Sequence, residues 1–376
     1  MNNYQICSNC VMDTSDPSIS FDSYGICDHC NQYYNRVEKY KKNNFNIELF
    51  KSQIKKIKQS GLNKEYDCIL GMSGGLDSSF MLHYAVVELG LRPLVFHVDC
   101  GWNSEIASSN IQKMVKKLKL DLFTEVINWE EMREFQLAFF RSGVPHIDLP
   151  QDHAYVGTLY KFAKKFKIKY ILNGGNISTE GVRNPLKLFY YGTDSIHIND
   201  IRQKFCNNPL KNFPFTSILT HKLWLRYLYG IKFVKILDHI DYKREDAIRL
   251  LNDKYEWISH GQKHFESRFT TFFEGYWLPK RFGFDTRRIQ LSSLILSNQI
   301  TRQEALKILE QQPLDELRVK EEKIYISNKL NISLLELEKF EEQPLKYYFD
   351  YNNSSRLFNL GAKFLHLLGV EKSVKR

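Results

Sequence analysis

Short apolar runs alternate with stretches of helical periodicity between about residue 66 and residue 172. The apolar runs have the length of buried strands and cover residues 66–72, 93–98, 122–127 and 169–172. Between them, apolar positions recur with a helical period over residues 78–89, 104–118, 130–141 and 152–166. This alternation predicts βαβ units on a parallel sheet, a fold class that binds ligands beyond the carboxyl ends of its strands.

The pattern changes on both sides of this region. Residues 1–30 are rich in cysteine, serine and aspartate, and residues 32–58 are basic with helical spacing. Residues 184–215 are loop-like and contain three prolines. From residue 223 onward the chain is mostly helical, and a last helix is expected over residues 354–368.

The composition is that of an ordinary globular protein of about two domains. Of the 376 residues, 43% are hydrophobic and 26% are charged, which excludes a disordered, collagen-like or disulfide-scaffold protein. The formal net charge of +10 favours anionic partners such as nucleotides, phosphosugars, RNA or an anionic membrane face. Eight basic residues lie between residues 36 and 58, and a solvated helix face explains them better than an RNA-binding stripe.

The sequence carries no recognisable targeting signal or membrane span. The N-terminus lacks a basic start followed by an apolar stretch, and no window approaches about 18 uninterrupted apolar residues. The seven cysteines are therefore expected to be thiols or metal ligands and not disulfides. We expect a cytoplasmic protein.

Four of the cysteines have the spacing of a metal site. Cys7 and Cys10 form one Cys-x₂-Cys pair, Cys27 and Cys30 form another, and sixteen residues separate the pairs. This spacing predicts a tetrahedral Cys₄ zinc site, because each pair forms a knuckle whose two thiolates converge on one ion. Four protein ligands close the coordination shell, so the zinc is expected to be structural.

The strongest local signal follows the first predicted strand, in the string Gly-Met-Ser-Gly-Gly-Leu-Asp-Ser-Ser at residues 71–79. Its glycines let a backbone approach a phosphate closely, its hydroxyls can donate hydrogen bonds, and a helix N-terminus follows at once. Asp77 makes sense beside phosphates if it binds Mg²⁺. A simpler interpretation, a glycine turn with Asp77 or Ser78 as the helix cap, does not explain the full string.

The string resembles the SGGxDS signature of the PP-loop ATP pyrophosphatases, whose members cleave ATP between the α and β phosphates. The resemblance implies a HUP-like parallel α/β fold and adenylation of a substrate oxygen, with Asp77, Ser73 and Ser78 as the catalytic candidates. It also implies adenosine contacts at the ends of neighbouring strands. The implied nucleotide-binding residues are Gly71, Ser73, Gly74, Gly75, Asp77, Ser78, Ser79, Val98, Asp99, Gly174, Gly175 and Asn176.

A wider resemblance covers most of the chain from Tyr4 to about Leu309. The segments 7–14, 25–30, 71–79, 265–270 and 276–288 resemble the N-acetyl sugar amidotransferase family of surface-polysaccharide biosynthesis (LPS, with O-antigen or nonulosonic acid as the product class). Members convert a sugar acetamido group into an acetamidino group. The resemblance implies ATP and Mg²⁺ as cofactors beside the structural zinc. It also implies a separate glutaminase subunit and a cyclase-like partner similar to those of histidine biosynthesis, because no glutaminase domain is visible.

Substrate candidates lie in two basic regions of the sequence. A cluster rich in phosphate- and carboxylate-binding groups contains Lys263, His264, Glu266, Arg268, Lys280, Arg281, Arg287 and Arg288, although a solvated basic face explains it equally well. Glu180 and Arg183, after the second Gly-Gly turn, are further candidates. We expect a zinc ribbon at 1–35, a basic helical linker at 36–62, a PP-loop domain at 63–220 and a helical substrate or partner region at 221–376.

Two other functions compete with this hypothesis. Some PP-loop enzymes with an N-terminal cysteine ribbon thiolate tRNA, but such enzymes need a second Cys pair near the ATP site, and no Cys-x₂-Cys follows Cys30. A nucleic-acid-binding module built on the ribbon and the basic segment would leave Asp77 and its loop without a purpose. We therefore expect no nucleic-acid partner, and the family resemblance implies an N-acetylated sugar as the substrate.

Overall fold

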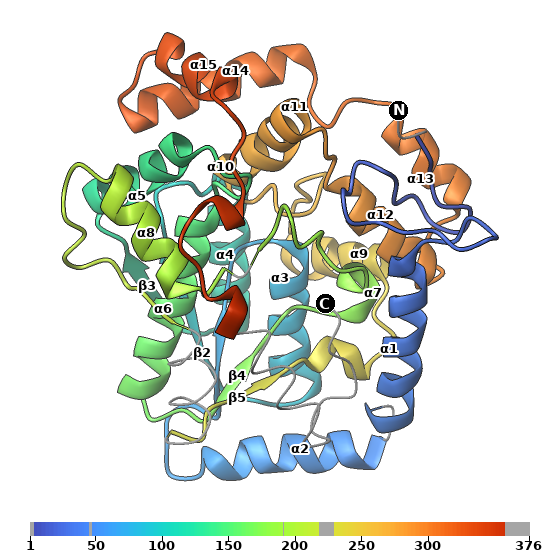
Figure 1. Cartoon of the computed structure of the whole chain (residues 1–376). Coiled ribbons are helices and arrows are strands. Elements are labelled where there is room, and N and C mark those ends of the chain that lie inside the picture. Colours follow the sequence, from blue (N-terminus) through green and yellow to red (C-terminus); the bar gives the residue numbers. More distant parts are fainter. Residues whose placement is uncertain (1–3, 45–46, 191, 218–228, 358–376) are drawn as a thin grey trace.

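The computed structural model describes residues 4–44, 47–190, 192–217 and 229–357. Within them, five strands form one sheet in the order β3-β2-β1-β4-β5, and every pair is parallel (Figure 1). The strands are β1 (Cys68–Gly71), β2 (Pro93–Asp99), β3 (Leu122–Val126), β4 (Tyr170–Leu172) and β5 (Lys232–Val234). The predicted parallel α/β class is confirmed.

Helices cover both faces of the sheet because side chains alternate between the faces along each buried strand. Leu70 and Val95 belong to one apolar cluster, together with residues of the helices α2, α3, α4 and α9. Ile69 and Phe96 belong to another cluster, together with residues of α5 and α6. These helices are α2 (Ile47–Ser60), α3 (Leu76–His83), α4 (Glu105–Leu118), α5 (Trp129–Ser142), α6 (Leu149–Lys165) and α9 (Arg244–Tyr255), and a π-helical turn (Tyr84–Glu88) continues α3.

The order of the strands reverses at β1. The chain builds β2 and β3 on one side of β1 and then returns to place β4 on the other side. Leu70 pairs with Leu172, so the segments that leave β1 and β4 begin at the same level of the sheet. Such a switch point opens a crevice at the carboxyl edge, and the loop at residues 71–79 borders it.

The helical C-terminal region shares an apolar core with the sheet and its helices, and its aromatic rings contact Phe140 on α5. Phe269, Phe272 and Trp277 are fully buried in the same cluster as Ile69 and Phe96. The described elements of this region are α10 (Arg268–Phe272), a π-helical turn (Phe273–Trp277), α11 (Leu278–Phe282), α12 (Arg287–Leu296), α13 (Arg302–Leu309), α14 (Glu316–Leu330) and α15 (Leu334–Glu342). No helix in the described part of the chain is long and apolar enough to cross a membrane.

The N-terminal ribbon lies beside α12 and α13 (Figure 1). The guanidinium of Arg302 donates to the carbonyl oxygens of Cys7 and Cys10 at 2.8–3.1 Å. The guanidinium of Arg288 donates to the carbonyl oxygen of Val11 at 2.8 Å. The ribbon is therefore joined to the C-terminal helices and leads through α1 (Asp28–Asn44) into α2.

The structure corrects two expectations about elements. Residues 184–215 are not all loop, because α8 (Ser195–Phe205) begins at the capping side chain of Asp194 and buries Ile198 and Ile201. The three-residue β5 lies in a region that the sequence predicted to be mostly helical. The described residues of the basic segment 32–58 are helical, as predicted, and belong to α1 and α2. Most of the helix expected over residues 354–368 lies outside the described residues.

His197 on α8 provides a test of the packing. It is fully buried against the rings of Tyr190 and Tyr348, and neither ring nitrogen has a hydrogen-bond partner among the described residues. Burial lowers the pKa of His197 to about 4, against 6.5 for an ordinary histidine.

We expect the stability of the wild type to fall relative to His197→Phe as the pH drops from about 6.5 to about 4. In this range the unfolded chain binds a proton at His197 that the folded chain excludes, a difference of up to about 3 kcal/mol in the free energy of unfolding. Urea unfolding of both proteins at several pH values measures it. Parallel pH profiles for the two proteins would contradict this interpretation.

Candidate functional site

The loop after β1 has the backbone of an anion site. Gly74 has φ +82°, and a Cβ built on it would lie 2.5 Å from the carbonyl oxygen of Ala107, so both conformation and space require glycine. Gly75 precedes α3 in an extended conformation with no side-chain cap. The first amides of α3 therefore face the crevice without a capping side chain, which favours a bound anion.

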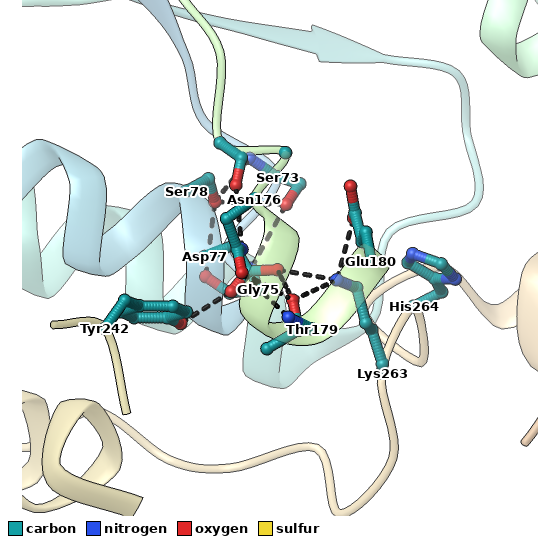
Figure 2. Close-up of polar contacts among 12 residues, drawn as sticks. Ser73, Gly75, Asp77, Ser78, Asn176, Thr179, Glu180, Tyr242, Lys263 and His264 are labelled. Carbon is teal, nitrogen blue, oxygen red and sulfur yellow. Dashed lines mark hydrogen bonds and ion pairs between the residues drawn. The ribbon is translucent and has the colours of Figure 1, made fainter. Parts of the chain in front are cut away.

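Two hydroxyl groups complete the loop (Figure 2). The Oγ atoms of Ser73 and Ser78 lie 3.1 Å apart, and the amide of Gly75 donates to Ser73 Oγ at 3.2 Å. Ser78 Oγ also donates to the carbonyl oxygen of Gly75 at 3.2 Å. These contacts hold both hydroxyls at the mouth of the loop before any ligand binds.

Asp77 lies at the centre of the polar contacts. Lys263 Nζ lies 2.7 Å from Asp77 Oδ2, and the hydroxyl of Tyr242 donates to Asp77 Oδ1 at 2.5 Å. Burial raises the pKa of the Asp77 carboxyl, but the ammonium of Lys263, the hydroxyl of Tyr242 and the charge of His264 together lower it by more, so the pKa lies below its ordinary value. Lys263 Nζ also contacts Thr179 Oγ1 at 2.9 Å and Glu180 Oε1 at 2.7 Å. Asp77 is therefore an ionised group within a network that also contains a second carboxylate.

Of the other nucleotide candidates, some lie at a cavity or against the loop, and the others are bonded or buried within the chain. Val98 lines a cavity at the end of β2, and Gly174 packs against the backbone of Asp77 and Ser78. Asp99 instead accepts from the amide of Gly101 at 2.8 Å. The side chain of Asn176 accepts from the amide of Thr179 at 2.9 Å and so caps α7 (Ile177–Glu180), while Gly175 donates to Asn173 at 2.7 Å. Gly71 ends β1, and Ser79 is fully buried below the loop.

Three cavities meet at this edge of the sheet. The first, of about 460 Å³, contains the loop residues Ser73, Gly75, Asp77 and Ser78. The second, of about 310 Å³, extends over the end of β2, and the third, of about 390 Å³, extends over α7 and contains Glu180 and Arg183. His264 borders all three cavities.

The ion pair of His264 keeps it charged. Its Nδ1 lies 2.9 Å from Glu274 Oε1. Burial lowers the pKa of His264, but the charge and the hydrogen bond of Glu274, together with the charge of Glu266, outweigh this and raise the pKa to about 9. His264 is thus the cationic member of an ion pair at the boundary between the cavities at neutral pH.

The C-terminal substrate candidates do not all gather at the loop. Lys263, His264 and Glu266 do, and Glu266 Oε1 accepts from Ser73 Oγ at 3.0 Å. The four arginines bind the chain itself, although Arg287 also borders the first cavity. Their partners are Glu322 for Arg268 (3.0 Å), the Gln343 carbonyl for Arg281 (2.6 Å), Asp285 for Arg287 (2.7 Å) and Asp13 for Arg288 (3.0 Å). Lys280 is exposed.

Sequence reasoning missed several residues that build the site. Tyr242 and Thr179 contact Asp77, and Trp257 Nε1 donates to the Gly74 carbonyl at 3.2 Å and to Ser79 Oγ at 3.1 Å. None of them belongs to a motif, and all three are brought to the loop by tertiary packing. Only the position of Thr179 beside the candidate Glu180 offered a signal.

The four ribbon cysteines converge on one point. Their Sγ atoms all lie within 4.8 Å of one another, and three of the separations are 3.8, 3.6 and 3.7 Å. Tetrahedral Zn–S bonds of about 2.3 Å place sulfur atoms about 3.8 Å apart. The amides of Asn9 and Cys10 each lie 3.4 Å from Cys7 Sγ, as donors that stabilise a thiolate. The donor set therefore fits one zinc ion with a closed shell.

The fold and the loop together define the class, a parallel α/β protein with an SGGxDS loop at its switch point and a Cys₄ cluster near its N-terminus. Residues 266–365 match the family model described as "LPS biosynthesis protein WbpG-like, C-terminal domain". Over these residues the match bears out the resemblance to a family of surface-polysaccharide biosynthesis. Among proteins with curated functions, none matches the chain.

The chain is similar to several solved structures, three of which compare with it in identity, coverage and TM-score as follows. The NMN synthetase of Francisella tularensis is 14% identical and covers 61% of this chain and 96% of its own, with a TM-score of 0.27. The NH₃-dependent NAD synthetase of Campylobacter jejuni is 12% identical and covers 60% and 93%, with a TM-score of 0.27. The U34-tRNA thiolase NcsA of Methanococcus maripaludis is 13% identical and covers 82% and 89%, with a TM-score of 0.29.

We expect the purified chain to contain about one zinc ion, and Cys10→Ser to lose it together with about 2–5 kcal/mol of unfolding free energy. The matched control is Cys206→Ser, because Cys206 lies outside the Cys₄ cluster. Metal analysis and urea unfolding measure both effects. Wild-type protein without near-stoichiometric zinc, or equal stability of the two variants, would refute the zinc site.

Proposed function

We propose that the chain is an ATP-dependent amidotransferase that forms AMP and pyrophosphate and converts a sugar N-acetyl group into an acetamidino group. The observation that carries the proposal is the SGGxDS loop at the switch point, with the ionised Asp77 at its centre. The WbpG-like C-terminal match supports a sugar of surface-polysaccharide biosynthesis as the substrate class.

The loop would hold the pyrophosphate part of ATP. The amides at the start of α3 and the hydroxyls of Ser73 and Ser78 supply donors at the place where negative charge increases when the α–β phosphate bond breaks. The oxygens of Asp77, Thr179 and Glu180 already surround one cation, the ammonium of Lys263, so this donor set fits Mg²⁺. Bound Mg²⁺ would neutralise charge on the departing pyrophosphate.

The reaction needs activation because an amide oxygen is a poor leaving group. The acetamide oxygen attacks the α-phosphorus, the bond to pyrophosphate breaks, and an imidoyl adenylate forms. Ammonia then adds to the imidoyl carbon, a proton is lost, and AMP departs with the former acetyl oxygen. No side-chain nucleophile is required, and the protein contributes position and charge stabilisation.

The nitrogen would come from a separate glutaminase, assisted by the cyclase-like partner. Ammonia at neutral pH is mostly ammonium, so a protected supply is an advantage. Cys7 is buried within the Cys₄ cluster and is therefore unsuited to be a glutaminase nucleophile. Sulfur transfer to tRNA is the weaker alternative, because Cys100 is the only cysteine among the described residues that line the three cavities.

We expect Asp77→Asn to abolish AMP and pyrophosphate formation while the fold remains intact. Its matched control is Asp241→Asn, which removes an exposed carboxylate next to Tyr242 and should keep activity. Chromatography of the nucleotides after incubation with ATP, Mg²⁺, ammonium and candidate N-acetylated sugars measures the products. ADP and phosphate in place of AMP and pyrophosphate would reject the proposal.

The mass of the sugar product identifies the nucleophile. Replacement of O by NH makes the product about 1 Da lighter, whereas replacement by S makes it about 16 Da heavier. We expect the isolated chain to use ammonium at raised pH and to use glutamine poorly until a cognate glutaminase is added. Efficient use of glutamine by the isolated chain would contradict the proposed partner, and a sulfur-bearing tRNA would overturn the assignment.

A further inference from the structure

The segment between α9 and α10, residues 257–267, forms a strap over the phosphate loop. At one end, Trp257 donates to the Gly74 carbonyl, and Ile258 exchanges two hydrogen bonds with the Asn110 side chain at 2.8 and 2.9 Å. At the other end, the amide of Ser104 donates to the carbonyl oxygen of Glu266 at 2.9 Å. The ends of the strap are thus fixed, and its side chains reach the loop from a set position.

The strap places an anion where the loop would hold a phosphate. Glu266 Oε1 accepts from Ser73 Oγ at 3.0 Å, and a Cβ built on Gly75 would lie 2.6 Å from the same oxygen. The carboxylate therefore fills the space that the glycine leaves open at the start of α3. A helix N-terminus attracts a carboxylate for the same reason that it attracts a phosphate.

The strap also places a cation among the oxygens that suit a metal. Lys263 Nζ contacts Asp77 Oδ2, Thr179 Oγ1 and Glu180 Oε1 at 2.7–2.9 Å. Figure 2 shows Lys263 reaching from the strap toward Asp77 and Glu180. Burial lowers the pKa of Lys263, but the two carboxylates outweigh it and raise the pKa above its ordinary value, so the ammonium stays charged.

We propose that the strap is an internal substitute for magnesium pyrophosphate, with Glu266 in the place of a phosphate and Lys263 in the place of the metal. The ligand must displace both side chains. The larger the fraction of molecules in which the strap fills the site, the weaker the apparent binding of the ligand. His264 and Glu266 border both the first and the second cavity, so withdrawal of Glu266 would widen the opening between them. The inference rests on the proposed function of the loop.

Binding of inorganic pyrophosphate with Mg²⁺ tests the first part of the proposal, that Glu266 occupies the place of a phosphate. Glu266→Gln keeps the shape and the hydrogen bond to Ser73 but removes the charge. The matched control is Glu245→Gln, which removes a carboxylate from the same cavity without touching the loop. Calorimetry of the full-length zinc-loaded proteins should show about tenfold tighter binding to Glu266→Gln, the effect of one removed like charge, and little change for the control.

Each other outcome contradicts the proposal. Unchanged binding would show that Glu266 does not occupy the pyrophosphate place, and weaker binding would show that it helps to hold the ligand. If pyrophosphate bound equally more tightly to both variants, the gain would come from the lower negative charge of the cavity and not from the position of Glu266. If neither pyrophosphate nor ATP binds to any of the three proteins, the proposed function of the loop fails together with the inference.

Binding of Mn²⁺ without nucleotide tests the second part of the proposal, that Lys263 occupies the place of the metal. Electron paramagnetic resonance measures the bound Mn²⁺. Lys263→Gln should bind Mn²⁺ about tenfold more tightly than the wild type does, because removal of the ammonium exposes the three oxygens. Lys243→Gln, at an exposed position, is the matched control and should match the wild type. Equal Mn²⁺ binding by all three proteins would show that Lys263 does not occupy a metal place.

Discussion

The ion pair between Lys263 and Asp77 joins two residues that lie 186 positions apart in the chain. Asp77 starts a helix on the parallel sheet, and Lys263 belongs to the strap before the C-terminal helices. An ionised carboxylate with so little exposure needs a partner, because an unpaired buried charge costs several kcal/mol. The pair therefore links the sheet to the C-terminal region beside the apolar core that the two regions share, and the three cavities lie where they meet.

The Cys₄ cluster supports this arrangement from a distance. The amide of Val11 donates to Ser292 Oγ on α12, and the amide of Val182 donates to the neighbouring Ser293 Oγ. Ser297 Oγ donates to the carbonyl oxygen of Ser178, in the helix that carries Thr179 and Glu180. A continuous set of contacts thus leads from the ribbon through α12 to the oxygens around Lys263. A metal with no open coordination position can still affect the site, because it fixes the ribbon that holds α12 and α7 in their relative positions.

Short sequence patterns correctly predicted those parts of the molecule whose conformation depends mainly on residues close to them in the chain. The buried strands of the sheet and the SGGxDS loop, with its glycine at positive φ, depend on neighbours within a few residues, and each was predicted close to its observed position. The paired Cys-x₂-Cys spacing likewise predicted four thiols that converge. β5 was missed because its three residues form a strand only beside β4.

The site beyond the loop depends on contacts that no local pattern contains. Tyr242 and Trp257 look like ordinary core residues in the sequence and reach the loop only through α9 and the strap. The basic cluster between Lys263 and Arg288 was predicted to bind the substrate, and for the same reason only some of its members lie at the site. Lys263 and His264 lie at the cavities, whereas the guanidinium groups of Arg268 and Arg281 bind Glu322 and the backbone of Gln343. Charge in a sequence shows that a partner is needed, and only the fold shows whether that partner is the chain itself.

The fate of the acetyl oxygen tests the central claim most directly. An N-acetylated sugar labelled with ¹⁸O in its acetamido carbonyl would be incubated with the full-length chain, ATP, Mg²⁺ and ammonium, and the nucleotide and phosphate products would be examined by mass spectrometry. Adenylation of that oxygen predicts that the label appears in AMP and that the pyrophosphate is unlabelled. Label in inorganic phosphate, or unlabelled AMP beside an aminated sugar, would contradict the account.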